Sequence, residues 1–115
     1  MRVFLLAGMY GTLCACTPSK VEKSYADTLI CFRAFTAASA VEAMTGSGGT
    51  SKDLSSEMVR RANYIGRLLG KSETEIKADL TEKLNISEIK GQPPEEVKKF
   101  TRDQLLIAAR CVNDL

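Results

Sequence analysis

Apolar residues recur at the 3.6-residue spacing of an α-helix along most of this 115-residue chain, in four runs that glycine or proline separates. The first run extends from about residue 21 to residue 45 and is apolar on more than one face, which is typical of a central helix. Its main stripe consists of Val21, Tyr25, Leu29, Phe32, Thr36, Ala40 and Ala43, with Phe35 and Ser39 at the edges. A flexible connection is expected over residues 46–50, where three glycines occur.

Two shorter helices are predicted after this connection. The second begins near Ser51 or Lys52, and Gly70 marks its end. The third begins with Ser72 and Glu75, which form the pattern of a capping box. The apolar stripe of the second helix consists of Leu54, Met58, Ala62, Ile65 and Leu69, and that of the third consists of Ile76, Leu80 and Leu84.

The last run follows Pro94, which suits the first turn of a helix. Glu95 and Glu96 lie at the end of the helix dipole that favours acids, and Arg110 lies near the end that favours bases. The stripe consists of Val97, Phe100, Gln104, Ala108, Cys111 and Leu115, with Leu105 and Val112 widening one side. Strand patterns are nearly absent. We therefore predict an all-α fold of about four helices in a small bundle.

The N-terminus has a different character. Arg2 precedes an apolar segment over residues 3–13, which is far shorter than the ~20 residues that a membrane-spanning helix needs. The segment ends in Leu13-Cys14-Ala15-Cys16. A charged start, a short apolar core, a small residue and then a cysteine resemble the signal of bacterial lipoproteins. An ordinary secretory signal would instead end in an A-x-A-like arrangement, which Leu13 does not fit.

This resemblance implies a location and an anchor. Residues 1–15 would be a signal peptide cleaved after Ala15, and Cys16 would carry a diacylglyceryl group and an amide-linked palmitate. Such an anchor holds a protein stably in the lipid bilayer, because two or more acyl chains are buried. The residue after it is Thr17 rather than Asp, which in this class favours the outer membrane, facing the periplasm. Residues 16–22 would form a lipidated tether, and residues 23–115 the helical domain.

The same resemblance gives the cysteines separate roles. Cys14 would leave with the signal peptide and Cys16 would be acylated, so that Cys31 and Cys111 remain. An extracytoplasmic compartment favours a disulfide between them, which would join the first and last helices. Two buried thiols or a redox couple are the alternatives, although no C-x-x-C spacing supports the redox couple.

The sequence offers little chemistry for catalysis. It contains no histidine, the commonest general base and metal ligand. Its carboxylate pairs occur where helix capping or solvation explains them: Glu73 with Glu75, Glu95 with Glu96, and Asp53 with Glu57. We therefore expect no enzymatic activity, no metal site and no cofactor. The 16 basic and 14 acidic residues nearly balance, which argues against a nucleic-acid partner.

A binding role remains. Small helical lipoproteins with one early and one late cysteine include the pilotins of secretion systems, which this chain resembles in size, anchor and cysteine placement. The likeness implies a protein-protein interaction or assembly module of the cell envelope, accessory to a secretion or conjugation apparatus, with an unknown envelope protein as partner. The candidate binding residues are Arg60, Arg61 and Arg67, together with the loop at residues 46–50. A solvated basic face is the alternative reading of these arginines.

Two further functions stay open. The region of Phe32, Phe35 and the neighbouring alanines could form a pocket in a carrier of a small apolar ligand. An inhibitor of an envelope enzyme would have a similar overall build.

Overall fold

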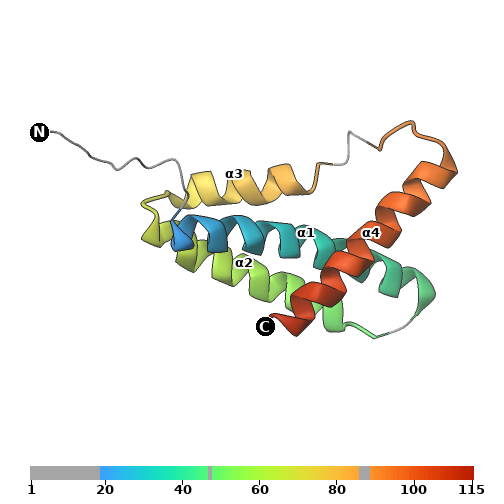
Figure 1. The fold of residues 1–115 in the computed structure, drawn as a ribbon, viewed down its shortest axis with the longest axis horizontal. Helices are drawn as coiled ribbons and strands as arrows, with labels where there is room; N and C mark the ends of the chain where they lie inside the picture. The colour runs from blue at the N-terminus through green and yellow to red at the C-terminus, as the bar shows by residue number, and fades with distance from the viewer. Residues whose placement is uncertain (1–18, 47, 86–88) are drawn as a thin grey trace, which may run out of the picture.

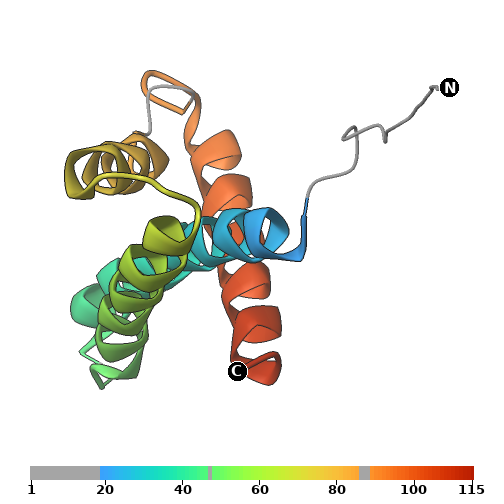
Figure 2. The same cartoon turned by 90° about the vertical axis from the view of Figure 1, so that its left-hand side faces the viewer.

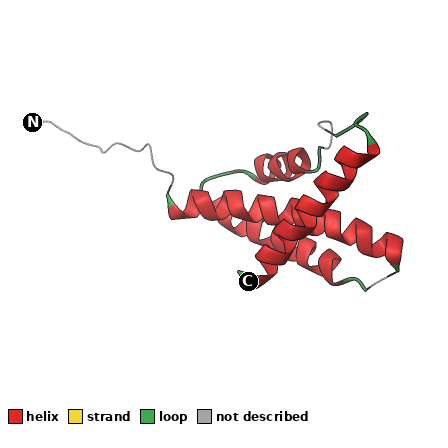
Figure 3. Ribbon diagram, turned by 45° about the vertical axis from the view of Figure 1, so that its right-hand side comes forward, coloured by secondary structure: helices red, strands yellow, loops and turns green. Residues whose placement is uncertain are grey.

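The computed structural model describes residues 19–46, 48–85 and 89–115. These residues form four helices and no strand: α1 Lys20–Thr45, α2 Thr50–Leu68, α3 Glu73–Lys83 and α4 Pro94–Asn113 (Figures 1 and 3). The predicted all-α fold of about four helices is confirmed. The predicted signal peptide and Cys16 lie outside the described residues. No helix in the described part of the chain is both long enough and apolar enough to cross a membrane.

Polar side chains fix where α1 and α3 begin. The Ser72 hydroxyl accepts from the Glu75 backbone N–H at 3.1 Å, and the Ser72 N–H donates to the Glu75 carboxylate at 2.8 Å, so the predicted capping box is confirmed. Ser19 and Glu22 form a second box of the same kind at the start of α1. The helix therefore begins at Lys20, three residues before the expected start of the helical domain.

α1 is the central element, as its apolar pattern predicts. It contacts each of the other three helices, and α2 also contacts α3. Among the described residues, α4 contacts α1 but neither α2 nor α3. Seen along α1, α2 and α3 lie together on one side and α4 lies on the other (Figure 2). The molecule is thus a bundle of three mutually contacting helices, α1, α2 and α3, which α4 crosses at a steep angle (Figure 1).

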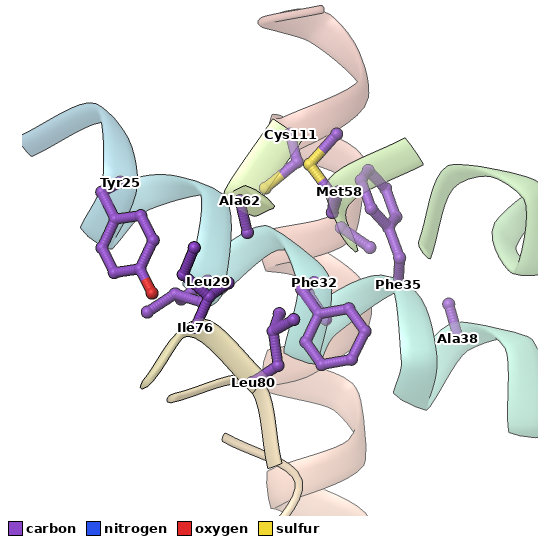
Figure 4. Packing of buried hydrophobic residues seen from close by; sticks show 12 residues of the cluster. Tyr25, Leu29, Phe32, Phe35, Ala38, Met58, Ala62, Ile76, Leu80 and Cys111 are labelled. Carbon is purple, nitrogen blue, oxygen red and sulfur yellow. The ribbon is translucent and has the colours of Figure 1, made fainter. Parts of the chain in front are cut away.

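The core lies where α1 meets α2 and α3 (Figure 4). Phe35, Met58 and Ile76 are its largest fully buried side chains. The other buried apolar residues are Tyr25, Leu29, Phe32, Ala34, Ala38, Ala62, Leu80, Ala108 and Cys111. Phe35 was expected at the edge of the α1 stripe, and this is wrong because neighbours on several sides of α1 enclose it. Leu84 was expected inside and is 44 % exposed, because α3 ends at Lys83.

The crossing angle limits what α4 buries. Only Gln104, Ala108 and Cys111, near the crossing point, are buried. Val97 and Leu115 lie nearer the two ends of the same stripe and are 36 % and 51 % exposed. The expectation that the whole stripe faces inward is therefore wrong at its ends.

A disulfide joins Cys31 on α1 to Cys111 on α4, with the two Cα atoms 5.9 Å apart. The predicted link between the first and last helices is confirmed. In the described structure α1 is the only helix that α4 contacts, so the disulfide lies within the main contact that α4 makes with the rest of the fold.

Candidate docking surfaces

The three arginines singled out in the sequence lie on the second half of α2 and point away from α1. The side chains of Arg60 and Arg61 are 74 % and 44 % exposed, and Arg67 is also exposed. Arg60 and Arg67 are seven residues apart, so they lie on the same side of the helix, two turns from each other. The structure thus brings the three charges together on one outer surface.

Glu57 orients two of these arginines. Its carboxylate accepts from Nη2 of Arg60 at 2.5 and 2.6 Å and from Nε of Arg61 at 3.3 Å. The hydrogen bond from Arg60 is the main cause that lowers the pKa of Glu57, and the same bond raises the pKa of Arg60. Glu57 is therefore charged at neutral pH. The surface keeps a positive excess, because it carries three arginines and Glu57 pairs with only two of them, Arg60 and Arg61.

Two large apolar side chains lie among the arginines. Tyr64 is 68 % exposed and Leu68 is 61 % exposed, one turn apart on the same side of α2. The sequence analysis missed them, although their spacing from Arg60 and Arg61 could have indicated them. We call the surface formed by Arg60, Arg61, Tyr64, Arg67 and Leu68 the basic face.

The described residues of the predicted loop, Gly46 and residues 48–50, do not join this surface. The loop precedes α2, which begins at Thr50, whereas Arg60 and Arg67 lie further along the helix. At the helical rise per residue, Arg60 is about 15 Å and Arg67 about 25 Å from the start of α2. The expected combination of loop and arginines is therefore not one compact surface, and the candidate site is restricted to the second half of α2.

A second surface lies along the boundary between α1 and α4. An open hollow of about 290 Å³ lies there, lined by residues of both helices. It adjoins a larger hollow of about 510 Å³ whose described lining belongs to α4 alone, and the two share Ile107 and Arg110. We call them together the α1–α4 groove. Its lining residues are Asp27, Ile30 and Cys31 from α1, and Asp103, Leu106, Ile107, Arg110, Cys111 and Asp114 from the C-terminal part of the chain. The sequence analysis missed this groove.

The other candidate chemistries have structural explanations. The Ser72 backbone N–H, followed by the Ser72 hydroxyl, lowers the pKa of Glu75, which acts in the capping box. Phe32 and Phe35, the expected lining of an apolar pocket, are packed inside the core. Within the part of the chain that the structure describes, no three His, Cys, Asp or Glu side chains gather as metal ligands would.

No protein-family model matches the sequence, and neither a curated protein nor a solved structure matches it.

Proposed function

We propose that this chain is a lipid-anchored periplasmic protein that serves as a small interaction or assembly module of the cell envelope, and that it binds a partner protein through the basic face. The observation that carries this proposal is the exposure of Tyr64 and Leu68 between arginines on the outer side of α2. Aromatic residues and arginine are enriched in protein interfaces and among the residues that dominate binding energy.

The fold itself does not account for this arrangement. α2 packs on α1 and α3 through Met58, Ala62 and Gly66, which are buried on its inner side. Tyr64 and Leu68 add nothing to that core, because both are mostly exposed. The carboxylate of Glu57 already holds Arg60 and Arg61 in place, which reduces the ordering that binding would require.

The anchor half of the proposal is supported by the sequence Leu13-Cys14-Ala15-Cys16, with acylation of Cys16 attaching the chain to the bilayer. An inhibitor of an envelope enzyme would use the same kind of surface, so the identity of the bound partner separates these two roles. A carrier of a small apolar ligand is less favoured, because the side chains expected to line its pocket fill the core instead.

The test is charge reversal on the basic face of the tagged full-length chain. Arg60→Glu with Arg61→Glu should abolish recovery of partner proteins from crosslinked membranes. Helicity and the disulfide should be unchanged, because substitutions on an exposed surface usually alter stability by no more than about 0.5 kcal/mol. Lys98→Glu with Arg102→Glu, a change of equal charge at exposed positions of α4, is the matched control and should leave recovery intact.

A second variant separates charge from apolar contact. Tyr64→Ala with Leu68→Ala keeps every arginine and should also weaken recovery, because it removes the apolar part of the basic face. Full recovery of the same partners by both double variants would contradict docking through this face.

A further inference from the structure

We propose that the α1–α4 groove binds the basic face of a second copy, so that the chain associates with itself head to tail. This inference deepens the proposed function, and it rests on that function in treating the basic face as a docking surface. It adds the groove as the complementary surface and names the occupant.

The two surfaces have opposite and matching charges. The groove lining includes three acids, Asp27, Asp103 and Asp114, together with Arg110. The basic face carries three arginines, and Glu57 lies beside them. The basic face is therefore mainly positive and the groove mainly negative. This favours binding of the basic face to the groove over binding of two basic faces or two grooves to each other.

Apolar side chains lie within both charge patterns. Ile30 and Leu106 of the groove are 44 % and 62 % exposed, and the half-buried Ile107 lies between the two hollows. Tyr64 and Leu68 supply the corresponding apolar contact on α2. A helix that lays an apolar stripe into a groove between two other helices is a recurrent mode of recognition.

The lengths of the two charge patterns are close enough for arginine side chains to bridge. Asp103 and Asp114 are eleven residues apart, which corresponds to about 16 Å along α4, and Asp27 lines the same hollow as Asp114. Arg60 and Arg67 are about 10 Å apart along α2, and extended arginine side chains can cover the difference. Since Asp27 and Asp114 line one hollow and Asp103 the other, the proposal pairs the adjacent Arg60 and Arg61 with Asp27 and Asp114, and Arg67 with Asp103.

The two surfaces are separate in the fold. α2 and α4 lie on different sides of α1 and make no contact among the described residues (Figure 2). Both surfaces of one molecule can therefore be occupied at the same time. Contacts between two different surfaces generate rings or open chains rather than a two-fold dimer.

Mixing two defective variants tests this geometry. The face variant carries Arg60→Glu with Arg61→Glu, and the groove variant carries Asp27→Asn with Asp114→Asn, which removes the acids without creating a basic groove that could bind the reversed face. Each full-length variant alone, in detergent solution, should self-associate about tenfold or more weakly than the unmodified chain in sedimentation velocity. An equimolar mixture should form one-to-one pairs that grow no further, because each variant keeps one intact surface. Lys98→Glu with Arg102→Glu should associate like the unmodified chain.

A photo-crosslink identifies the surfaces directly. Two differently tagged full-length copies, each with benzoylphenylalanine at position 64, are mixed and irradiated. The crosslink should join one tagged copy to the other, and its attachment site should map to α4 near Leu106 and Ile107. An unmodified chain that stays monomeric, a mixture that forms no pairs, or a crosslink between two α2 helices would each overturn the proposal. If the chain is monomeric and the face variant still loses its partner proteins, the self-association is wrong while the proposed function stands.

Discussion

At the scale of single residues, Tyr25 shows how a side chain can serve the core and the surface together. Its ring is buried in the core (Figure 4). Its hydroxyl donates to Oδ2 of Asp79, on α3, at 2.7 Å. Lys71 lies over the ring and also pairs with Asp79 at 3.3 Å. Burial raises the pKa of Tyr25 most, followed by the hydrogen bond to Asp79 and by the charges of Asp79 and Glu75.

This raised pKa predicts a loss of stability in alkali. An unfolded tyrosine titrates near 10, so the folded state holds its proton more tightly above that pH. The contribution of the Tyr25 proton to the free energy of unfolding is therefore fully present below about pH 10, and it is lost as the pH rises toward the pKa of Tyr25 in the folded state. Urea unfolding between pH 8 and pH 11.5 measures it. Tyr25→Phe should cost about 1 kcal/mol at pH 8 by removing the hydrogen bond, and should have a shallower alkaline decline than the unmodified chain.

Tyr64→Phe is the control for this measurement. Tyr64 is exposed, and its hydroxyl bonds to no side chain among the described residues. The unfolding free energy of Tyr64→Phe at pH 8 should lie close to that of the unmodified chain, because the substitution breaks no hydrogen bond within the fold. An identical alkaline slope for the unmodified chain and Tyr25→Phe would show that the Tyr25 proton does not support the fold.

At the scale of helices, the sequence predicted best those features that depend only on adjacent residues, such as where a helix begins. The capping box at Ser72 and the start of α4 at Pro94 depend on a few adjacent residues, and both predictions are confirmed. Burial depends on where other helices lie, which periodicity alone does not contain. This is why Phe35 at 0 % and Leu115 at 51 % exposure differ from expectation.

Gly66 is another residue whose role appears only in the packed structure. It is buried on α2, and a Cβ atom placed there would lie 2.7 Å from Cγ1 and Cδ1 of Ile76 and 3.1 Å from Cε1 of Tyr25. Gly66→Ala should therefore destabilise the protein by about 1–2 kcal/mol in urea unfolding, because overpacking outweighs the gain of about 1 kcal/mol in helix propensity. Ser56→Ala, at an exposed position of α2, should be nearly neutral. An unchanged or higher stability of Gly66→Ala would mean that Ile76 can move aside.

The disulfide should matter most for α4, whose helical contacts in the described structure are all with α1. Native protein should show no reactive thiol at Cys31 or Cys111, and reduction should lower the unfolding free energy by about 2–5 kcal/mol. Hydrogen exchange of the reduced protein should rise first in α4, while the contacts among α1, α2 and α3 persist. Equal protection of α4 and α1 after reduction would contradict this order.

At the scale of the whole molecule, the candidate surfaces differ in how far they could be predicted. Arg60, Arg61 and Arg67 are close in sequence, so a helical pattern places them on one outer surface. The α1–α4 groove joins Asp27 to Asp114, residues that meet only because α4 crosses α1. No local pattern contains that crossing angle.

The last prediction concerns the attachment of the whole molecule to the membrane. The N-cap of α1 is Ser19, only three residues after Cys16. An extended chain spans at most about 3.6 Å per residue, so acylation of Cys16 would hold the start of α1 within about 11 Å of the lipid attachment point. Cys16→Ser should abolish incorporation of labelled palmitate, leave the precursor unprocessed and reduce the recovery of partner proteins. Cys14→Ser should be processed and labelled normally, because Cys14 would leave with the signal peptide. Undiminished labelling of Cys16→Ser, measured beside Cys14→Ser in the same membranes, would refute the anchor and with it the periplasmic, membrane-attached setting proposed for the basic face.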